Sequence, residues 1–168
     1  MPEGYGFAGC IKNLTYNADG YRSVLAGGPQ YESYEARDRA IEAAAARPLG
    51  QIIETLRAAQ DALVAAFEAE TDFGRTVQML VRPTQPGLMT LGRRREIEVH
   101  HLDLDLGRSP NEIDAGYVER DTAMLTVWWE AKNGMTLPAT IASEPTLDRW
   151  LWLVGRTELD GEDRAGLF

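Results

Sequence analysis

The sequence predicts a mainly α-helical fold, an up-and-down helical bundle followed by a short C-terminal α/β segment. Three observations support this fold class. Apolar residues recur at spacings of three and four in several long segments. Segments with the alternation typical of a β-strand are few and short. Amphipathic helices bury their apolar faces most simply by packing against one another. We therefore expect a helical-bundle domain over residues 1–134 and a small α/β segment over residues 135–168.

Three helices are expected in the first part of the chain. Residues 8–25 carry apolar side chains at helical spacing and are followed by the breakers Gly27, Gly28 and Pro29. Ser33 stands three residues before Ala36 and is the expected N-cap of a second helix, which stops before Pro48. Residues 48–70 carry one broad apolar stripe, which predicts a third amphipathic helix.

The middle of the chain is harder to assign. Residues 71–92 contain several glycine and proline breakers and are expected to be irregular, with RTVQMLV as a short strand or an extended connector. In residues 93–107 the apolar positions nearly alternate with polar ones, which favours a strand. If the same segment is a helix, Glu96, His100 and Asp103 share one face. The hydrophobic period alone does not decide between the two.

The C-terminal part is expected to contain two more helices and one strand. Asn111 is the expected N-cap of the first helix, which Gly134 would end. A short strand is expected in TLPATIA, residues 136–142, and a last short helix in residues 146–156.

Composition and charge exclude several classes of function. The chain has 17 basic and 26 acidic residues and a net charge of −9, whereas nucleic-acid binding needs clustered Lys and Arg. No apolar run approaches the roughly 20 residues that cross a bilayer, and no signal-peptide pattern is present. A single cysteine, Cys10, excludes an internal disulfide and a cysteine-rich zinc site. We expect a soluble, cytoplasmic protein that binds neither nucleic acid nor membrane.

The two histidines are the first candidates for chemistry. His100 and His101 are adjacent, so a metal centre with three histidines is excluded. On a helix, Glu96 and His100 would present a carboxylate and an imidazole to one point, which suits a divalent metal such as zinc. Most pairs at this spacing are ordinary solvated neighbours, and Glu98 with His101 is an equally plausible pair.

Four segments together resemble one known family. RRREIEVHHLDLDLG matches the pattern Arg-x-Arg-Glu-Val-x-Val-His-x-x-Asp-Leu from Arg93 to Leu104, and NLTYNADGYRSVL is similar to His-Leu-Ala-x-Asn-Ala-Asp. YEARDRAIEAAAARP and WLVGR are similar to an Arg-Asp-x-x-Ile-Glu segment and a late Trp-Leu-x-Gly-Arg segment. The set resembles the mycothiol-dependent maleylpyruvate isomerase family, which has a DinB-like four-helix bundle. The resemblance implies that fold and makes residues 93–107 a helix.

The resemblance also implies a metal site. In that family a zinc ion is held by one histidine of an earlier helix and by the glutamate and histidine of the later one. The thiolate of mycothiol or a related thiol can complete the coordination. Carried onto this chain, the later pair is Glu96 and His100, and the first ligand position is Asn13. The implied cofactors are zinc or another divalent metal, and mycothiol or a related thiol, and the implied partner is a small-molecule substrate.

This chain departs from the family at the first ligand. An amide is a poor zinc ligand beside an imidazole, so Asn13 is either a weak ligand or a buried, hydrogen-bonded amide that replaced one. Asp103 shares the face of Glu96 and His100 and is a possible further ligand. Cys10 lies three residues before Asn13, where it either faces the site or is a buried, inert thiol.

The late arginine and the N-terminus carry two further implications. Arg156 is the implied catalytic residue, because a guanidinium can bind substrate carboxylates, although an arginine here can also serve as a helix C-terminal cation. Family members have an additional helix before the loop that MPEGYGF resembles. This first helix is therefore expected to be missing, truncated or supplied by a partner chain, and a homodimer could complete the bundle.

Two functions remain open at this point. The first is a metal- and low-molecular-weight-thiol-dependent isomerase or transferase of the maleylpyruvate isomerase type. The second is a non-catalytic descendant of that fold with a degenerate metal site, which binds a small ligand or a protein partner. The well-preserved later motif favours the first function, whereas Asn13 and the missing helix favour the second.

Overall fold

The fold is mainly helical, as the sequence predicts. The computed structural model describes residues 7–159, 161–163 and 165, and the chain divides into two compact units, Met1–Leu106 and Gly107–Phe168. The expected domain boundary after residue 134 falls inside the second unit and stays a prediction.

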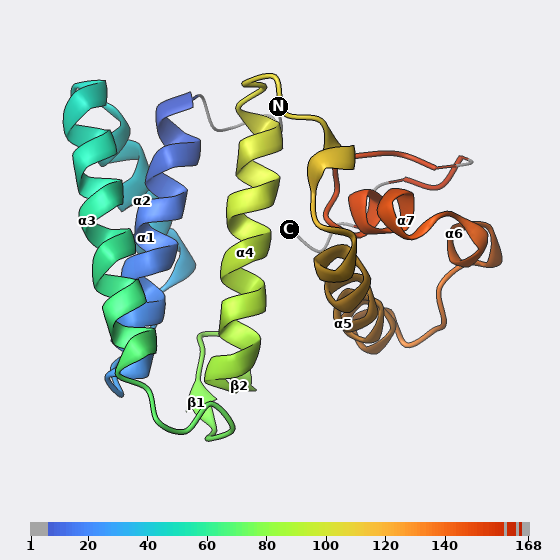
Figure 1. Cartoon of the computed structure of the whole chain (residues 1–168), viewed down its shortest axis with the longest axis horizontal. Coiled ribbons are helices and arrows are strands. Elements are labelled where there is room, and N and C mark those ends of the chain that lie inside the picture. Colours follow the sequence, from blue (N-terminus) through green and yellow to red (C-terminus); the bar gives the residue numbers. More distant parts are fainter. Residues whose placement is uncertain (1–6, 160, 164, 166–168) are drawn as a thin grey trace. The chain divides into compact units, whose positions relative to one another are not determined.

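The first unit contains most of the helical bundle. Its elements are α1 (Phe7–Leu25), α2 (Tyr34–Ala45), α3 (Leu49–Glu68), β1 (Val77–Gln78), β2 (Pro83–Thr84) and α4 (Pro86–Asp103). Helix α1 packs against α2, α3 and α4, and the long helices α1, α3 and α4 lie side by side in Figure 1. The three helices expected within residues 8–70 are confirmed, and so is the N-cap at Ser33, whose hydroxyl accepts a hydrogen bond from the Ala36 N–H at 3.1 Å.

Helix α4 settles the ambiguous middle of the chain. Residues 93–103 are helical, as the resemblance implies, but the helix begins earlier, at Pro86. The prediction of irregular structure up to residue 92 is therefore wrong for its last seven residues. Proline is favoured in the first helical turn, because its fixed φ suits the helix and its missing N–H would have no intrahelical partner there. Here the proline marks a helix start rather than a break.

The core of the first unit joins three helices and one strand. The pairing of β1 with β2 is antiparallel and brings the buried Val77 under the helices, so the expected short strand is present. The buried cluster is made of Ala18, Tyr21, Val24, Ala59, Leu63, Val77 and Met89. Gly92 of α4 is required by this packing, because a Cβ there would lie 2.8 Å from the Tyr21 hydroxyl on α1. The two helices that carry the candidate site residues are thus closely packed.

The second unit contains the remaining helices. Its elements are the 3₁₀ turn η1 (Pro110–Glu112) and helices α5 (Ala115–Asn133), α6 (Ala139–Ser143) and α7 (Thr146–Leu153), and α5 packs against α7. Gly134 ends α5 with a left-handed φ of 67°, as expected. The N-cap of α5 is Asp114 and not Asn111, since the Asp114 carboxylate accepts from the Tyr117 N–H at 2.7 Å. Asn111 lies instead in η1, which Ser109 caps.

The prediction of a strand at residues 136–142 is wrong, because α6 occupies most of that segment. Pro138 stands at the N-cap, and Ile141 is fully buried. Alanine at positions 139 and 142 favours a helical turn over an extended strand. Among the described residues after 134, β-structure is confined to an isolated bridge between Leu159 and Glu162.

A buried carboxylate organises the core of the second unit. Asp121 is fully buried in α5 and accepts hydrogen bonds from the Trp150 indole N–H at 2.8 Å and from the Tyr117 hydroxyl at 3.1 Å. The rings of Tyr117 and Trp150 meet edge to face at 6.2 Å. These aromatic side chains therefore form core, and their polar atoms are satisfied by one carboxylate.

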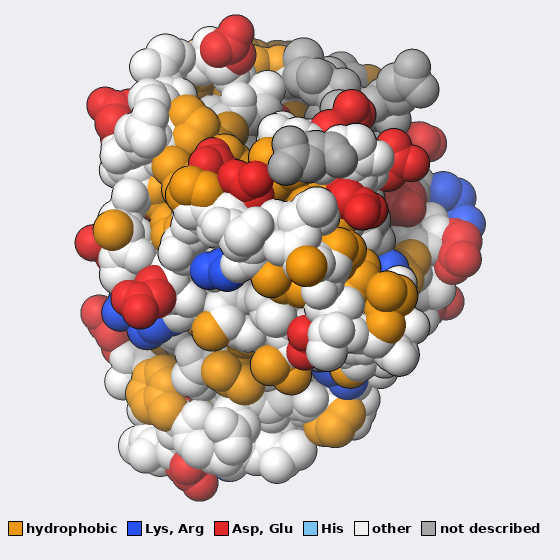
Figure 2. Space-filling view, turned by 90° about the vertical axis from the view of Figure 1, so that its right-hand side faces the viewer, with side chains coloured by type: hydrophobic (Ala, Val, Ile, Leu, Met, Phe, Trp, Pro, Cys, Tyr) orange, Lys and Arg blue, Asp and Glu red, His pale blue; other side chains and the backbone are white. Residues whose placement is uncertain are grey.

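The described surface is mixed in character. Acidic side chains are spread across the face shown in Figure 2, with hydrophobic side chains between them. Among the described residues, Val127 and Met135 are hydrophobic side chains that are mostly exposed. Within the part of the chain that the structure describes, every helix is too short or too polar to span a bilayer.

Candidate metal centre

The candidate site lies where α1 and α4 pack side by side in opposite directions. The Arg93 guanidinium, in the middle of α4, donates to the Leu14 carbonyl at 2.8 Å and to the Asn17 side chain at 3.0 Å. Further along α4, His100 contacts Asn13, which lies earlier in α1. Later residues of α1 thus meet earlier residues of α4, so the helices are antiparallel.

His100 is at the centre of the cluster, and its side chain is only 10% exposed. Its Nε2 atom lies 2.7 Å from Nδ2 of Asn13 and 3.6 Å from Oε2 of Glu96. Its Nδ1 atom lies 3.2 Å from Oδ2 of Asp103. The structure therefore brings together Glu96, His100 and Asn13, the three metal-site positions that the resemblance implies.

The alternative pair has a different setting. Glu98 is buried and forms an ion pair with Arg94 at 3.5 Å, one turn earlier on the same helix. His101 is partly buried. The His100 ring, by contrast, contacts Asn13 and Asp103.

Cys10 is a member of the cluster that sequence reasoning left undecided. Its thiol is free and buried, with 2% of the residue exposed. The sulfur, a ring nitrogen of His100 and a carboxylate oxygen of Asp103 all lie within 4.8 Å of one another. The signal in the sequence is the spacing of three residues between Cys10 and Asn13, which places both on one face of α1.

The electrostatics of the cluster favour a positive charge on the ring. Burial lowers the pKa of His100, but hydrogen bonds with Asp103, Cys10 and Glu96 outweigh it and raise the pKa to about 11. Burial raises the pKa of Glu96, whereas its hydrogen bond with His100 and the charges of His100 and Arg95 lower it overall. Any metal that binds at His100 must therefore displace a proton from the ring.

The Asn13 amide can adapt to either charge state of the ring. When Nδ2 donates, Nε2 of His100 is the acceptor and the ring is neutral. When Nε2 carries a proton, the amide turned by half a rotation offers Oδ1 to it at the same separation. The contact of 2.7 Å is thus compatible with both tautomers and with the imidazolium.

Arg93 belongs to the sequence motif of α4, and its role is visible only in the structure, where its side chain joins three helices. Besides its two contacts to α1, its Nε and Nη2 atoms donate to the Gln60 side chain of α3 at 3.1 and 2.7 Å. Burial lowers the pKa of this guanidinium, but an arginine remains charged at neutral pH. One buried cation therefore connects α1, α3 and α4 near the candidate site.

Arg156, the implied catalytic residue, lies in the second unit just after α7. Its Nη1 atom donates to the Val154 carbonyl at 2.7 Å, across Gly155 with its φ of 73°. This local contact involves one of its donors, and a role in binding a substrate stays a prediction.

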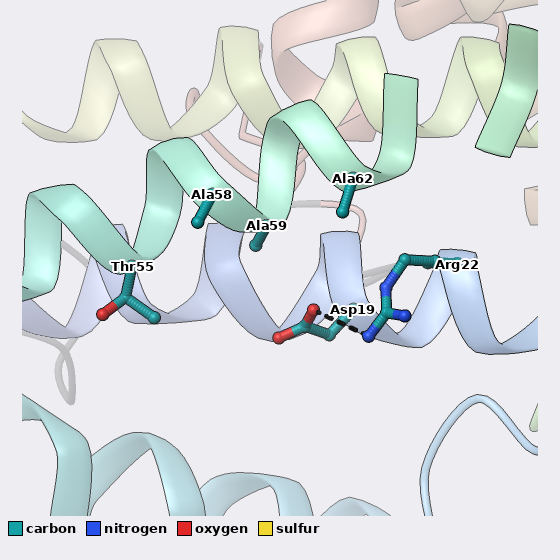
Figure 3. Close-up of a pocket in the computed structure, with 6 residues that line it drawn as sticks. All are labelled: Asp19, Arg22, Thr55, Ala58, Ala59 and Ala62. Atoms are coloured by element: carbon teal, nitrogen blue, oxygen red, sulfur yellow. Dashed lines mark ion pairs between the residues drawn. The ribbon is translucent and has the colours of Figure 1, made fainter. Parts of the chain in front are cut away.

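A shallow pocket lies elsewhere on the first unit, between α1 and α3. Figure 3 shows its lining, which consists of Asp19, Arg22, Thr55, Ala58, Ala59 and Ala62. Asp19 and Arg22 form an ion pair at 3.6 Å across one helical turn, and both side chains are substantially exposed. None of the predicted site residues lines this pocket.

The donor set around His100 fits a divalent metal of the zinc type. Thiolate sulfur, imidazole nitrogen and carboxylate oxygen are the three common protein ligands of zinc, and the cluster offers all three. The Asn13 amide is the member that fits worst, since amide oxygens suit harder cations such as calcium. The site is therefore suited to a metal, but not through the family's exact ligands.

Comparisons with known proteins identify a family and a similar fold. Residues 14–105 match the family described as the mycothiol maleylpyruvate isomerase N-terminal domain. The fold is similar to the crystal structure of the mycothiol-dependent maleylpyruvate isomerase and to that of a mutant of that enzyme. Each comparison gives a TM-score of 0.81 and 17% identity over 92% of this chain and 76% of the other. No curated protein matches the chain significantly.

The two kinds of similarity support different conclusions. At 17% identity the solved structures show the fold alone, and they confirm the predicted helical bundle. The family match covers more than half of the chain, including α3, α4 and most of α1. The chain therefore belongs to the mycothiol maleylpyruvate isomerase family, through its N-terminal domain.

Proposed function

We propose that the chain is a metal- and low-molecular-weight-thiol-dependent isomerase or transferase of the maleylpyruvate isomerase type. One observation carries the proposal. Helix α4 presents Glu96 and His100 to Asn13 on α1, the position at which the family has its first metal ligand. The pairing of these helices, and not only the motif in α4, thus supports a metal centre.

The residues of the cluster have separable roles in this proposal. In the arrangement carried over from the family, Glu96 and His100 hold the divalent ion, which supplies a Lewis acid that lowers the pKa of a bound thiol. The contact between Asp103 and Nδ1 holds the imidazole ring in place. Arg156 is proposed to bind a substrate carboxylate through paired N–H donors.

The proposed reaction acts on an electron-poor double bond of a small carboxylate, of the kind found in maleylpyruvate. Isomerisation of such a bond needs temporary single-bond character, which reversible addition of one thiol provides. A transferase would instead release the addition product. We propose a cytoplasmic location, because low-molecular-weight thiols are kept reduced there.

Metal analysis and turnover of the purified protein test this proposal together. We expect close to one zinc or related ion per chain, and mycothiol-dependent conversion of maleylpyruvate. His100→Ala should lose both, whereas His101→Ala, which changes the neighbouring imidazole, should keep both. Metal-loaded protein without any thiol-dependent turnover of maleylpyruvate or related electrophiles would overturn the proposal.

A second candidate function is a non-catalytic binding protein with a degenerate metal site. The observation that favours it is the hydrogen bond between Asn13 and His100, which satisfies the ring without a metal. In that case the wild-type protein would retain no metal after purification, while Asn13→His would acquire it.

The homodimer expected from the resemblance is also a proposal. Sedimentation equilibrium tests it directly, since an obligate dimer would dissociate and unfold in one concentration-dependent step. A monomer at all accessible concentrations, with a cooperative melt, would contradict it.

A further inference from the structure

Because α1 and α4 pack in antiparallel directions, Cys10 lies nearer the C-terminal end of α4 than Asn13 does. Leu14 and Asn17 of α1 contact Arg93, whereas Asn13, which is earlier in α1, contacts His100, which is later in α4. Residues nearer the start of α1 therefore contact residues nearer the end of α4. Cys10, one turn before Asn13, therefore lies level with the end of α4 that carries Asp103. The observed proximity of the three groups agrees with this register.

His100 thus has different neighbours at its two nitrogens. On the Nε2 side lie Asn13 at 2.7 Å and Glu96 at 3.6 Å. On the Nδ1 side lies Asp103 at 3.2 Å, and the Cys10 sulfur lies within 4.8 Å of a carboxylate oxygen of Asp103 and of a ring nitrogen of His100. In a tetrahedral zinc site, bonds of about 2.0–2.3 Å put neighbouring ligand atoms about 3.3–3.8 Å apart. The separation between Nδ1 and Asp103 is already close to that value.

We propose that this chain binds its metal ion through the Cys10 sulfur, Nδ1 of His100 and a carboxylate oxygen of Asp103, one helical turn from the family's first-ligand position. The sulfur replaces the imidazole that Asn13 no longer provides. Three protein ligands leave one position of a tetrahedral ion open, as in catalytic zinc sites. The inference rests on the proposed function only in that both require a metal at His100.

The same arrangement explains the asparagine at position 13. A neutral histidine that ligates through Nδ1 carries its proton on Nε2, and ligating histidines nearly always donate this proton to an oxygen. Oδ1 of Asn13, with the amide turned to face the ring, and the carboxylate of Glu96 are the acceptors within reach. Asn13 and Glu96 then orient the ring and do not bind the ion.

Binding in this arrangement has a defined proton balance. Bonds form from the metal to sulfur, nitrogen and oxygen, and no bond between heavy atoms breaks. The Cys10 thiol and the imidazolium each lose one proton to solvent. The ion contributes two positive charges in exchange for two protons, so the net charge of the cluster stays the same.

Cobalt(II) substitution provides the decisive measurement, because thiolate ligation gives a near-ultraviolet charge-transfer band that nitrogen and oxygen ligands do not give. We expect the band in the wild type at one Co²⁺ per chain and its loss in Cys10→Ser. Cys10→Ser and Asp103→Asn should each weaken Zn²⁺ binding by more than the roughly 10–100-fold that loss of an outer hydrogen bond costs. Glu96→Gln and Asn13→Ala should keep the charge-transfer band, and each should weaken Zn²⁺ binding by no more than that range.

A measurement on the wild type alone covers the case in which a variant fails to fold. Zn²⁺ should protect Cys10 from alkylation after partial unfolding in mild denaturant, and Mg²⁺ at the same concentration should not. Zn²⁺ bound to folded protein without such protection would contradict the proposal.

The outcomes separate this inference from the proposed function. One outcome overturns the inference and leaves the proposed function standing. In it, Co²⁺ binds without a sulfur charge-transfer band, Cys10→Ser does not change the Co²⁺ affinity, and Glu96→Gln abolishes Co²⁺ binding. A sulfur band that Cys10→Ser removes, in a protein without thiol-dependent turnover, supports the inference and contradicts the function. A wild type that binds neither Zn²⁺ nor Co²⁺ overturns the inference.

Discussion

Nδ2 of Asn13 lies 2.7 Å from Nε2 of His100, so the amide occupies the Nε2 side of the ring. A hydrogen bond at Nε2 and a metal at Nε2 exclude each other. Any metal binding at His100 therefore depends on the residue at position 13 and on the groups that Nδ1 can reach.

Replacing the asparagine should restore the family's ligand set. In a Cys10→Ser background, which removes the sulfur, Asn13→His adds an imidazole opposite Glu96 and His100. We expect the double variant to bind Zn²⁺ at least about tenfold more tightly than Cys10→Ser alone, because imidazole is a better zinc ligand than an amide. Isothermal titration calorimetry measures the difference. Equal affinity in the two proteins would show that Glu96 and His100 cannot form a site with position 13.

Loss of the Arg93 guanidinium should destabilise the first unit. Arg93→Met leaves the Leu14 carbonyl and the side chains of Asn17 and Gln60 without their buried donor. We expect the free energy of unfolding to fall by about 2–3 kcal/mol, measured by urea denaturation, since hydrogen bonds to charged groups are the strong ones. Arg57→Met, at an exposed position of α3, is the control and should cost less than about 1 kcal/mol. Equal losses in the two variants would contradict the supporting role.

The sequence was sufficient for the parts of the site that one helix carries. Glu96, His100 and Asp103 share a face of α4 by spacing alone, and the motif resemblance assigned that segment to a helix. Contacts between helices depend on the register of α1 against α4, which spacing within a single helix does not contain. The contacts of Cys10 and Arg93 between α1 and α4 therefore do not follow from the sequence pattern, although the pattern does predict the helices that carry them.

Local errors had local causes. The pattern predicts Pro86 as a breaker and Pro138 as a strand residue, whereas Pro86 begins α4 and Pro138 is the N-cap of α6. Asn111 and Asp114 are both good caps, and the choice between them depended on the 3₁₀ turn that Ser109 starts. Residue propensity thus identifies residue types that favour helix ends, but it does not determine at which of them a helix starts.

The Glu70–Arg75 ion pair predicts an acid-dependent loss of stability. The Glu70 carboxylate lies 2.6 Å from Nη2 of Arg75, and the same guanidinium donates to the Leu25 carbonyl at the end of α1. Hydrogen bonds from Arg75 and from the backbone of Asp72 hold the pKa of Glu70 below its usual value of 4.5. A carboxyl whose pKa is lowered by folding stabilises the protein above its unfolded pKa, and this contribution is lost as the pH falls through the folded pKa.

Glu70→Gln should therefore be less stable than the wild type at pH about 7, and the difference should shrink as the pH falls below about 4. Urea denaturation over this pH range measures the difference. Glu68→Gln removes one negative charge from the same helix end and serves as the charge-matched control. If the difference in the free energy of unfolding between the wild type and Glu70→Gln stays constant with pH, the ion pair does not contribute to stability.

Asp121 should be the most sensitive polar position of the second unit. Asp121→Ala removes the acceptor of both the Trp150 indole N–H and the Tyr117 hydroxyl inside a fully buried site. Each buried donor left without a partner costs about 1–3 kcal/mol, so we expect a loss of about 2–4 kcal/mol. Glu119→Ala, an exposed change on the same helix, should stay within about 0.5 kcal/mol of the wild type. Near-ultraviolet circular dichroism, which follows tryptophan packing, and urea denaturation measure both variants. A loss in Asp121→Ala no larger than that in Glu119→Ala would show that the carboxylate is not what holds α7 against α5.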